Sequence, residues 1–325
     1  MPNSTDGLKV VCIAGTGQNG ATVLSRMLGR LPGMVAAGEV GFLWDRALLG
    51  DQPCGCGQPF SRCPFWSRVG DEAFGGWSGV DPRRATELRD AILLRRRHLS
   101  LPMAFPFMLW PGLSPRYSRN LQAYAGLVRR LYEGIRTASG AEVIVDSTKV
   151  PGHAYMLRRM EGVDVRVVHL VRDSRGVAYS NLRLVERQSS IGGKTHRGRH
   201  APHNTAARWM WINLSIEVLA RLGGPSMRVG YESLIRSPRE ELERIMAFAG
   251  SSVAAGDLDF VRDGEVDLPV GHLVAGNRMR QLTGRVPLRV DDAWRTGLDP
   301  RQQRLVHLMT WPLLRRYGIR GESGS

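Results

Sequence analysis

Short apolar runs alternate with amphipathic segments along most of the chain. Runs rich in β-branched residues predict buried strands at 10–13, 142–146, 165–171 and 226–229, and a further short strand that ends near Gly38. Apolar residues at helical spacing predict helices between these runs, among them 118–138, 204–222 and 238–248. Repeated strand–loop–helix units indicate a central parallel sheet with helices on both faces. We therefore expect a single α/β domain over residues 1–325, with a P-loop-like sheet.

The first predicted strand runs into a glycine-rich loop. Gly15, Gly17 and Gly20 stand within six residues, and a helix is expected to begin near Thr22. A strand, a glycine loop and a helix in this order present backbone N–H groups and the positive end of a helix to a phosphate. The spacing is that of a Walker A loop, but Ala21 stands where the lysine is needed, which argues against a kinase or NTPase. An ordinary glycine turn is the alternative for this stretch alone.

Chemically active side chains follow the other predicted strands. Glu39, Lys149, Arg172 and Tyr231 each stand at or just after a strand end. The carboxyl ends of parallel strands meet at one edge of a sheet, where ligands of α/β proteins bind. Glu39 is a candidate general base there, and a solvated loop carboxylate is the alternative interpretation.

Three cysteines lie close together in the sequence, at Cys54, Cys56 and Cys63. A structural zinc site takes four ligands. The remaining cysteine, Cys12, is predicted inside the first strand, and no histidine stands nearby in the sequence. The sequence therefore favours a packed glycine-rich loop over a zinc site or a local disulfide, and we predict no metal.

The net charge narrows the ligand class. The chain has 325 residues, with 45 Lys+Arg against 30 Asp+Glu and a net charge of +15. Arginine supplies most of the cations, which suits phosphate or sulfate recognition, although a general arginine bias would look the same. Basic residues are not interleaved with aromatic ones, which argues against nucleic acid as a partner. A signal-peptide pattern and an apolar run of about 18 residues are both missing, so we expect a cytoplasmic protein with at most peripheral membrane contact.

Residues 99–113 are strongly apolar yet contain three prolines. This composition predicts neither a regular helix nor a membrane span. Two interpretations stay open, a hydrophobic lip for an apolar acceptor or a membrane surface, and a loop packed on the core.

With these motifs in place, the chain resembles the sulfotransferases that use 3′-phosphoadenosine 5′-phosphosulfate (PAPS), and in particular a bacterial branch of them. The resemblance rests on motifs in family order: the glycine loop, Gly38-Glu39, Cys-Gly-Cys-Gly…Cys-Pro-Phe-Trp, Asp146-Ser147-Thr148-Lys149, 171–180, Tyr231-Glu232, 276–280 and 291–294. It implies transfer of a sulfonate from PAPS to a hydroxyl or amine of a small acceptor, a lipid or secondary metabolite being candidates. The implied reaction is an in-line displacement that releases 3′,5′-ADP and requires no metal.

The resemblance also divides the chain and assigns residues. Residues 8–50 would hold the glycine loop and the base, 99–113 an acceptor-side insert, 142–250 the 3′-phosphate and adenine region, and 271–297 a closing basic loop. The 5′-phosphosulfate would lie against the loop, the 3′-phosphate against an arginine and a serine, and the adenine near a tyrosine. The residues at these positions are Gly17, Gln18, Asn19, Gly20, Ala21 and Thr22 for the loop, Arg172 and Ser180 for the 3′-phosphate, Tyr231 for adenine, and Arg278, Arg280 and Gly284 for closure.

The implied catalytic groups are Glu39 as the base and Lys149 as the cation for the transferring sulfonate and leaving oxygen, with His153 as a second candidate base. Two positions depart from the family pattern, because Gln18 stands where an arginine or lysine is usual and Asn19 stands where a serine is usual. Gln18 can donate hydrogen bonds but brings no charge. Loss of one charge-assisted hydrogen bond is worth about 1.5–3 kcal/mol. The alternative function is therefore a non-catalytic nucleotide-binding or scaffold relative. The sequence does not identify the acceptor or the oligomeric state.

Overall fold

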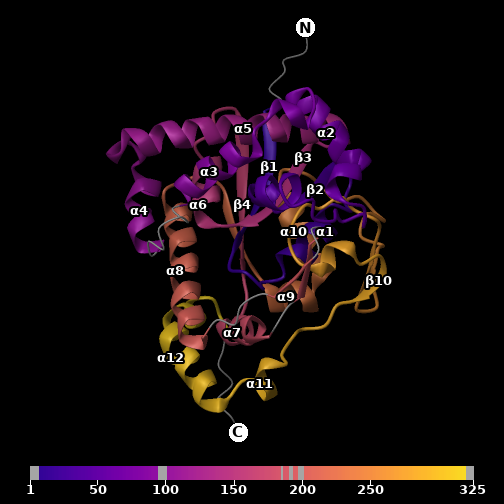
Figure 1. The fold of residues 1–325 in the computed structure, drawn as a ribbon. Helices are drawn as coiled ribbons and strands as arrows, with labels where there is room; N and C mark the ends of the chain where they lie inside the picture. Colours follow the sequence, from indigo (N-terminus) through magenta and orange to yellow (C-terminus); the bar gives the residue numbers. More distant parts are fainter. Residues whose placement is uncertain (1–6, 94–100, 184–185, 190–192, 197–200, 320–325) are drawn as a thin grey trace.

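The computed structural model describes residues 7–93, 101–183, 186–189, 193–196 and 201–319. Its centre is a five-stranded sheet in which all strands are parallel (Figure 1). This confirms the expected α/β fold. The strands, in their order across the sheet, are β2 (Met34–Gly38), β3 (Val143–Lys149), β1 (Leu8–Gly15), β4 (Val163–Val171) and β7 (Ser226–Gly230).

The central strand β1 is apolar on both of its sides because helices cover both faces of the sheet. Val10 and Cys12 pack into one hydrophobic cluster, whereas Val11 and Ile13 pack into the other. Successive side chains of a strand point to opposite faces, so a strand buried on both faces has a nearly continuous apolar sequence. This explains why the strands could be recognised from uninterrupted apolar runs.

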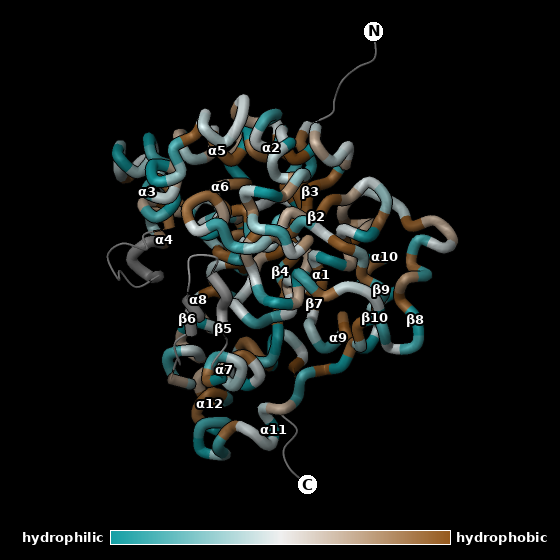
Figure 2. Tube along the Cα trace, turned by 45° about the vertical axis from the view of Figure 1, so that its right-hand side comes forward, coloured by the Kyte–Doolittle hydropathy of each residue, from teal (hydrophilic) through white to brown (hydrophobic). Residues whose placement is uncertain are grey.

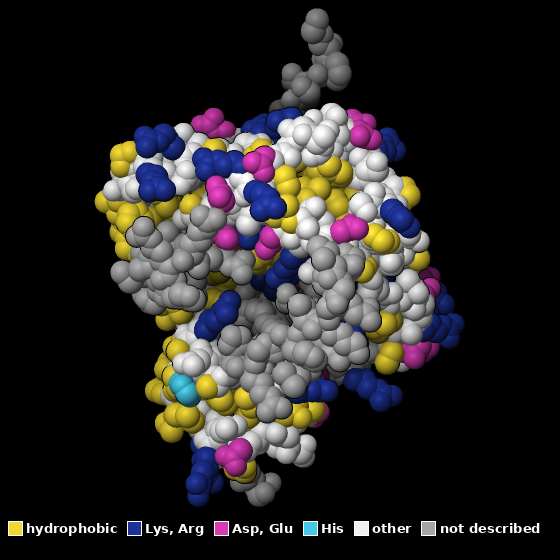
Figure 3. Space-filling model, viewed as in Figure 1, with side chains coloured by type: hydrophobic (Ala, Val, Ile, Leu, Met, Phe, Trp, Pro, Cys, Tyr) yellow, Lys and Arg dark blue, Asp and Glu magenta, His cyan; other side chains and the backbone are white. Residues whose placement is uncertain are grey.

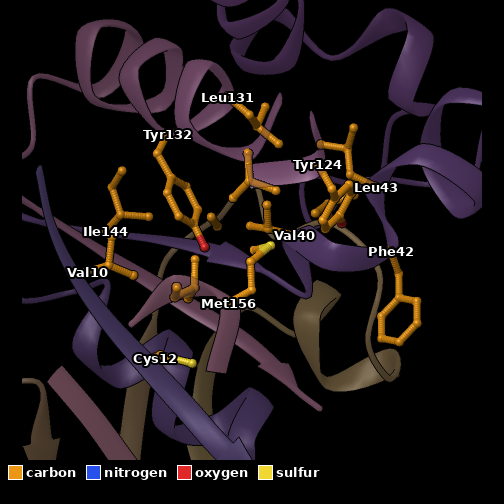
Figure 4. Packing of buried hydrophobic residues seen from close by; sticks show 14 of the residues in the cluster. Val10, Cys12, Val40, Phe42, Leu43, Tyr124, Leu131, Tyr132, Ile144 and Met156 are labelled. Atoms are coloured by element: carbon orange, nitrogen blue, oxygen red, sulfur yellow. The ribbon is translucent and has the colours of Figure 1, made fainter. Parts of the chain in front are cut away.

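Two sets of helices cover the sheet (Figure 1). Leu131 and Tyr132 of the long helix α5 (Pro115–Ser139) belong to the same buried cluster as Val10 and Ile144 of the sheet (Figure 4). The helices that pack on this first face are α2 (Pro64–Phe74), α3 (Pro82–Ile92), α5, α6 (Pro151–Leu157) and α8 (Pro202–Arg221). Those on the second face are α1 (Ala21–Leu28), α9 (Tyr231–Arg236) and α10 (Pro238–Phe248).

The remaining helices pack beside α8. Val177, Trp209 and Leu313 join α7 (Ser174–Leu182), α8 and α12 (Pro300–Arg316) in a smaller cluster, and α11 (Trp294–Gly297) lies against α7. Figure 2 shows hydrophilic residues along the outer helix α3 and hydrophobic ones around the fully buried α6. A short antiparallel pair, β5 (Glu186–Ser189) and β6 (Gly193–His196), precedes α8. Among the described residues, no helix combines the length and hydrophobicity needed to span a lipid bilayer.

Residues 99–113 contain a helix, so the prediction that they form no regular helix was wrong. Helix α4 covers Leu101–Leu109, with Pro106 inside it. Phe105 packs edge-on against Tyr155 and Trp211, and Met108 is buried. A proline in the first turn of a helix removes no helical hydrogen bond, and apolar packing of this helix offsets the cost of Pro106 in its interior. These contacts support the interpretation of a segment packed on the core.

The acidic segment 256–271 contributes to a second, smaller sheet. Three short strands form a small antiparallel sheet: β8 (Val261–Arg262), β9 (Glu265–Leu268) and β10 (Gly284–Pro287). Val266 and Leu268 are buried and alternate with the exposed Asp267. Two apolar residues are too few to reveal a period of two in the sequence.

A buried histidine joins β4 to α8. His169 is 5% exposed, and its Nε2 lies 2.7 Å from Oδ1 of Asn213. Because the Asn213 amide group donates to the carbonyl of Trp209, its Oδ1 accepts a hydrogen bond from His169. Burial lowers the pKa of the His169 imidazole to about 4, more than the Asn213 hydrogen bond raises it, and the charge of Arg228 lowers it further.

We expect this histidine to make stability pH-dependent. Its ordinary pKa is about 6.5, so between pH 6.5 and about 4 the unfolded state binds more protons than the folded state. The free energy of unfolding should therefore fall by about 3 kcal/mol as the pH is lowered through this range. His169→Gln keeps a donor for Asn213 but cannot titrate, so its urea unfolding curves should show a shallower pH slope. The exposed His203→Gln is the control. Equal slopes in all three proteins would contradict the assignment.

Candidate functional site

A cleft lies at the carboxyl edge of the sheet, as the strand ends predicted. Its volume is about 290 Å³, and Figure 3 shows Lys and Arg side chains at the hollow in the middle of this face. The glycine loop, the end of β3, the turn after β2, helix α8 and residues 276–281 enclose it. Its charged and loop residues are Gly17, Gln18, Asn19, Gly20, Ala21, Thr22, Glu39, Arg46, Lys149, Arg208, Arg278 and Arg280.

The glycine loop is tied to β4 by Asn19. This side chain is 1% exposed, donates to the carbonyl of Leu170 at 2.8 Å and accepts from the N–H of Ala21 at 3.2 Å. Gly20 precedes α1 with a φ of 90°, a conformation that favours glycine. A Cβ atom at Gly20 would also lie 2.6 Å from the Tyr231 ring. The loop therefore turns the N-terminus of α1 toward the cleft, where its N–H groups can meet an anion.

A bulge in β3 positions Lys149. Cys12 pairs with Asp146 while Ala14 pairs with Lys149, so β3 has one more residue than β1 over this interval. Lys149 itself has a φ of 67°, in the left-handed region that is uncommon for a lysine. Bulges and such backbone conformations redirect side chains and are frequent at functional sites. Here they bring the ammonium group to the carboxylate of Glu39.

Glu39 lies between two cations at the end of β2. Its Oε1 pairs with Lys149, and its Oε2 pairs with Arg46 at 3.0 Å. The preceding Gly38 has a φ of 84°, and a Cβ atom there would lie 2.3 Å from the carbonyl oxygen of Val274. Glu39 N–H donates to that same carbonyl at 2.9 Å. The backbone of the predicted base is thus fixed by a segment more than 200 residues away in the sequence.

His153 does not line the cleft, unlike the other two predicted catalytic residues. It is 2% exposed, and its Nε2 lies 2.8 Å from Oδ2 of the fully buried Asp146, which also accepts from Tyr132. The other Asp146 oxygen accepts from the N–H and hydroxyl of Thr148. Burial raises the Asp146 pKa, but the His153 charge and these hydrogen bonds outweigh it and hold the pKa below its usual value. This network fixes the end of β3, and of the two candidate bases Glu39 lines the cleft and His153 does not.

Arg172 lies on the other side of the glycine loop, outside the lining of this cleft. It donates to the backbone oxygen of Gln18 at 2.8 Å and contacts the Ser180 hydroxyl at 3.4 Å. Its guanidinium lies over the Tyr231 ring, 4.7 Å from the centroid, and pairs with the Asp291 carboxylate at 3.0 Å. The three residues predicted for the 3′-phosphate and adenine are therefore together, and Asp291 of the expected closing loop 271–297 joins them.

The predicted closing residues have different positions. Arg278 is exposed and lines the cleft, whereas Gly284 begins β10 away from it. The Arg280 guanidinium donates to the carbonyls of Pro53, Gly276 and Asn277. Arg280 therefore holds the segment in place, as does the buried Arg26 of α1, which donates to the carbonyls of Pro269, Met279 and Leu282.

Two arginines of the cleft were missed by the sequence analysis. Arg46 comes from a π-helical turn, Leu43–Leu48, and stacks on Phe42 at 4.3 Å. Arg208 lies on α8, one turn before Ile212, which also lines the cleft. The four-residue spacing of Arg208 and Ile212, which places both on one face of a helix, was the only indication of this position in the sequence. No residue of the described part of 99–113 lines the cleft, so an acceptor-side role of that segment stays a prediction.

The cysteine loop also differs from expectation. The imidazole of His272 lies beside Cys54 and Cys63. It adds a fourth group that can bind a metal, and it comes from a part of the sequence far from the three cysteines. The reason for favouring a packed glycine-rich loop over a zinc site, the lack of a fourth ligand, therefore does not hold in the folded chain. All four cysteines of the chain are free thiols.

The chain matches no protein-family model and no curated protein sequence. It is similar in structure to several sulfotransferases over nearly its full length. The sulfotransferase domain of the Synechococcus PCC 7002 olefin synthase is 18% identical, with a TM-score of 0.45 over 95% of this chain and 97% of that one. The sulfotransferase domain from the curacin biosynthetic pathway is 15% identical, with a TM-score of 0.46 over 94% and 97%. A sulfotransferase of Mycobacterium avium is 13% identical, with a TM-score of 0.48 over 98% and 79%.

Proposed function

We propose that the chain is a sulfotransferase that moves the sulfonate of PAPS to a hydroxyl or amine of a small acceptor. The observation that carries the proposal is the pairing of Glu39 with Lys149 beside the N-terminus of α1, in one cleft. A base, a cation and an anion-binding helix end are the three groups that sulfonate transfer needs. The series of sequence motifs supports the same reaction.

The cleft has cations to offset those missing from the glycine loop. Ala21 and Gln18 bring no charge, but Lys149, Arg46, Arg208 and Arg278 line the same cleft. A phosphosulfate bound at the loop would lie near several of them. The departure at Gln18 is therefore compatible with cofactor binding, and it is the Glu39–Lys149 pair in the cleft that favours the enzyme over the non-catalytic relative.

Glu39 and Lys149 can divide the chemistry between them. As the acceptor oxygen forms its bond to sulfur, Glu39 takes the acceptor proton, and the bond from sulfur to the phosphate oxygen breaks. The electron pair of that bond remains on the phosphate oxygen, whose charge Lys149 stabilises. Arg46 holds the Glu39 carboxylate in position from its other side.

On the other side of the loop, Arg172 and Ser180 are suited to the 3′-phosphate of PAPS. An arginine fork binds a phosphate through two parallel hydrogen bonds. In this structure Asp291 takes up one side of that fork. A bound 3′-phosphate would replace the Asp291 carboxylate beside Arg172.

The first test is calorimetric titration of the protein with 3′,5′-ADP, with ATP–Mg²⁺ as the comparison. We expect binding of 3′,5′-ADP and little of ATP. Arg172→Ala should weaken 3′,5′-ADP binding at least tenfold, because a charge-assisted bond to the phosphate is worth about 1.5–3 kcal/mol. The control is Arg183→Ala, which removes an exposed arginine directly after α7, the helix that contains Ser180, and this variant should bind 3′,5′-ADP normally. Unchanged affinity of Arg172→Ala would contradict the phosphate assignment.

The second test concerns the base. We expect Glu39→Gln to bind 3′,5′-ADP but to lower transfer of labelled sulfonate from PAPS to a panel of phenols and aliphatic alcohols by about 10²–10⁴-fold. Glu72→Gln, an exposed glutamate of α2, is the control. Undiminished transfer by Glu39→Gln would place the base elsewhere. Nucleotide binding by the unmodified chain without any transfer to the panel would favour the non-catalytic alternative.

The third test concerns Asp291. Its side chain is 38% exposed, so the ion pair with Arg172 is partly screened. Asp291→Asn removes a negative charge that competes with the 3′-phosphate, and we expect 3′,5′-ADP to bind about two- to fivefold more tightly. Weaker binding would mean instead that Asp291 orients Arg172 for its ligand.

A further inference from the structure

Three cysteines and a histidine converge at a place that the proposed reaction does not use. Cys54, Cys56 and Cys63 lie in the loop before α2, and His272 lies 209 residues after Cys63. The three sulfur atoms and a ring nitrogen of His272 all lie within 4.8 Å of one another. None of the four residues lines the cleft.

Four of the six separations between these ligand atoms are close to those around one tetrahedral zinc ion, and all six lie within 4.8 Å. With Zn–S bonds of about 2.3 Å and a Zn–N bond of about 2.0–2.1 Å, tetrahedral geometry places sulfur atoms about 3.8 Å apart and sulfur about 3.6 Å from nitrogen. Cys63 Sγ lies 3.6 Å from Cys54 Sγ and 3.8 Å from Cys56 Sγ. His272 Nδ1 lies 3.3 Å from Cys63 Sγ and 3.8 Å from Cys54 Sγ.

The groups around the cluster hold the ligands in these positions. The His272 ring is stacked on Phe65, with centroids 5.0 Å apart, and its carbonyl accepts from the Trp66 indole at 2.7 Å. Backbone N–H groups of Cys56 and Trp66 contact the sulfurs of Cys54 and Cys63. Such contacts from outside the ligand set orient ligands and stabilise thiolates.

We propose that Cys54, Cys56, Cys63 and His272 bind a structural zinc ion. Three thiolates and an imidazole form a ligand set typical of structural zinc, and four protein ligands leave no coordination position for a substrate. The role that follows is mechanical, because the ion would join two parts of the chain that are far apart in sequence.

Residues 271–281, the segment that contains His272, form one wall of the cleft. Two residues after His272, Val274 pairs with Gly38, directly before Glu39, and Arg278 lines the cleft. Direct hydrogen bonds already link the same two parts, from Gly55 to Leu273 and from Gln281 to Cys54. A zinc ion at the centre of these bonds would fasten residues 271–281 beside the glycine loop.

Metal analysis of the full-length protein after exhaustive washing with a chelator resin tests the site. We expect one zinc per chain in the unmodified protein and in Cys12→Ala, which removes the cysteine outside the cluster. Cys56→Ala should lose most of the zinc, and it should still fold because Cys56 is only half-buried. His272→Ala should lose zinc, whereas His272→Cys supplies a fourth thiolate and should retain it.

Substitution with Co²⁺ gives a second readout that needs no enzyme activity. A thiolate-to-cobalt charge-transfer band and intense d–d bands are expected from tetrahedral coordination by sulfur, present in Cys12→Ala and absent or altered in Cys56→Ala. Purified protein that holds no zinc and does not take up Co²⁺, or that holds a disulfide among these cysteines, would overturn the proposal. Iron in place of zinc would overturn the choice of metal.

Hydrogen exchange tests the fastening role. In Cys56→Ala, amides of 271–281 should exchange faster than in Cys12→Ala, while amides of α12, which packs against α7 and α8, should be unchanged. Equal protection of 271–281 in the two variants would show that the ion does not fasten this wall. Because these measurements need neither PAPS nor an acceptor, their outcome is independent of the proposed enzymatic function.

Discussion

Parallel alignment of the five strands is the constraint on which the rest of this structure depends. It forces each strand to deliver its C-terminal residues to the same edge, so the glycine loop, Glu39, Lys149, Arg172 and Tyr231 meet there although they span more than 200 residues of sequence. Helices then have to cover both faces, and the open edge is left as the place for a cleft. Position along each strand, more than proximity in sequence, decides which side chains meet.

Local chemistry at that edge depends on irregular backbone. The bulge in β3, the left-handed conformation of Lys149 and the glycine at position 38 all interrupt regular strand geometry within a few residues of the cleft. The buried network around Asp146 stabilises this irregular backbone, because Asp146 accepts from the N–H and hydroxyl of Thr148 and joins this strand end to His153 of α6. A histidine that looks like a base in the sequence is in this way part of the support.

The sheet and most helices could be predicted from the sequence, because buried parallel strands have continuous apolar sequences. The C-terminal ends of the predicted strands then indicated where many of the site residues lie. Helix α4 was not predicted because its prolines argue against a helix, whereas the apolar packing that stabilises it is not visible in the sequence. Strands β8–β10 were not predicted because their apolar pattern is too short. Arg46, Arg208 and His272 could not be placed, since each joins its partners only through the tertiary fold. The sequence also could not distinguish the exposed Arg278 from Arg26 and Arg280, whose guanidinium groups bind backbone carbonyls.

These last two arginines have a consequence for how the protein can diverge. Arg26 and Arg280 hold the segment 269–282 through main-chain oxygens, which every type of amino acid possesses. The path of the segment therefore depends on these two guanidinium groups and on backbone carbonyls, and less on which side chains stand at the bound positions Gly276, Asn277 and Met279. Natural variation or directed evolution can therefore change side chains at the rim of the cleft while the backbone of this segment keeps its path. Such changes would alter which ligands the cleft accepts.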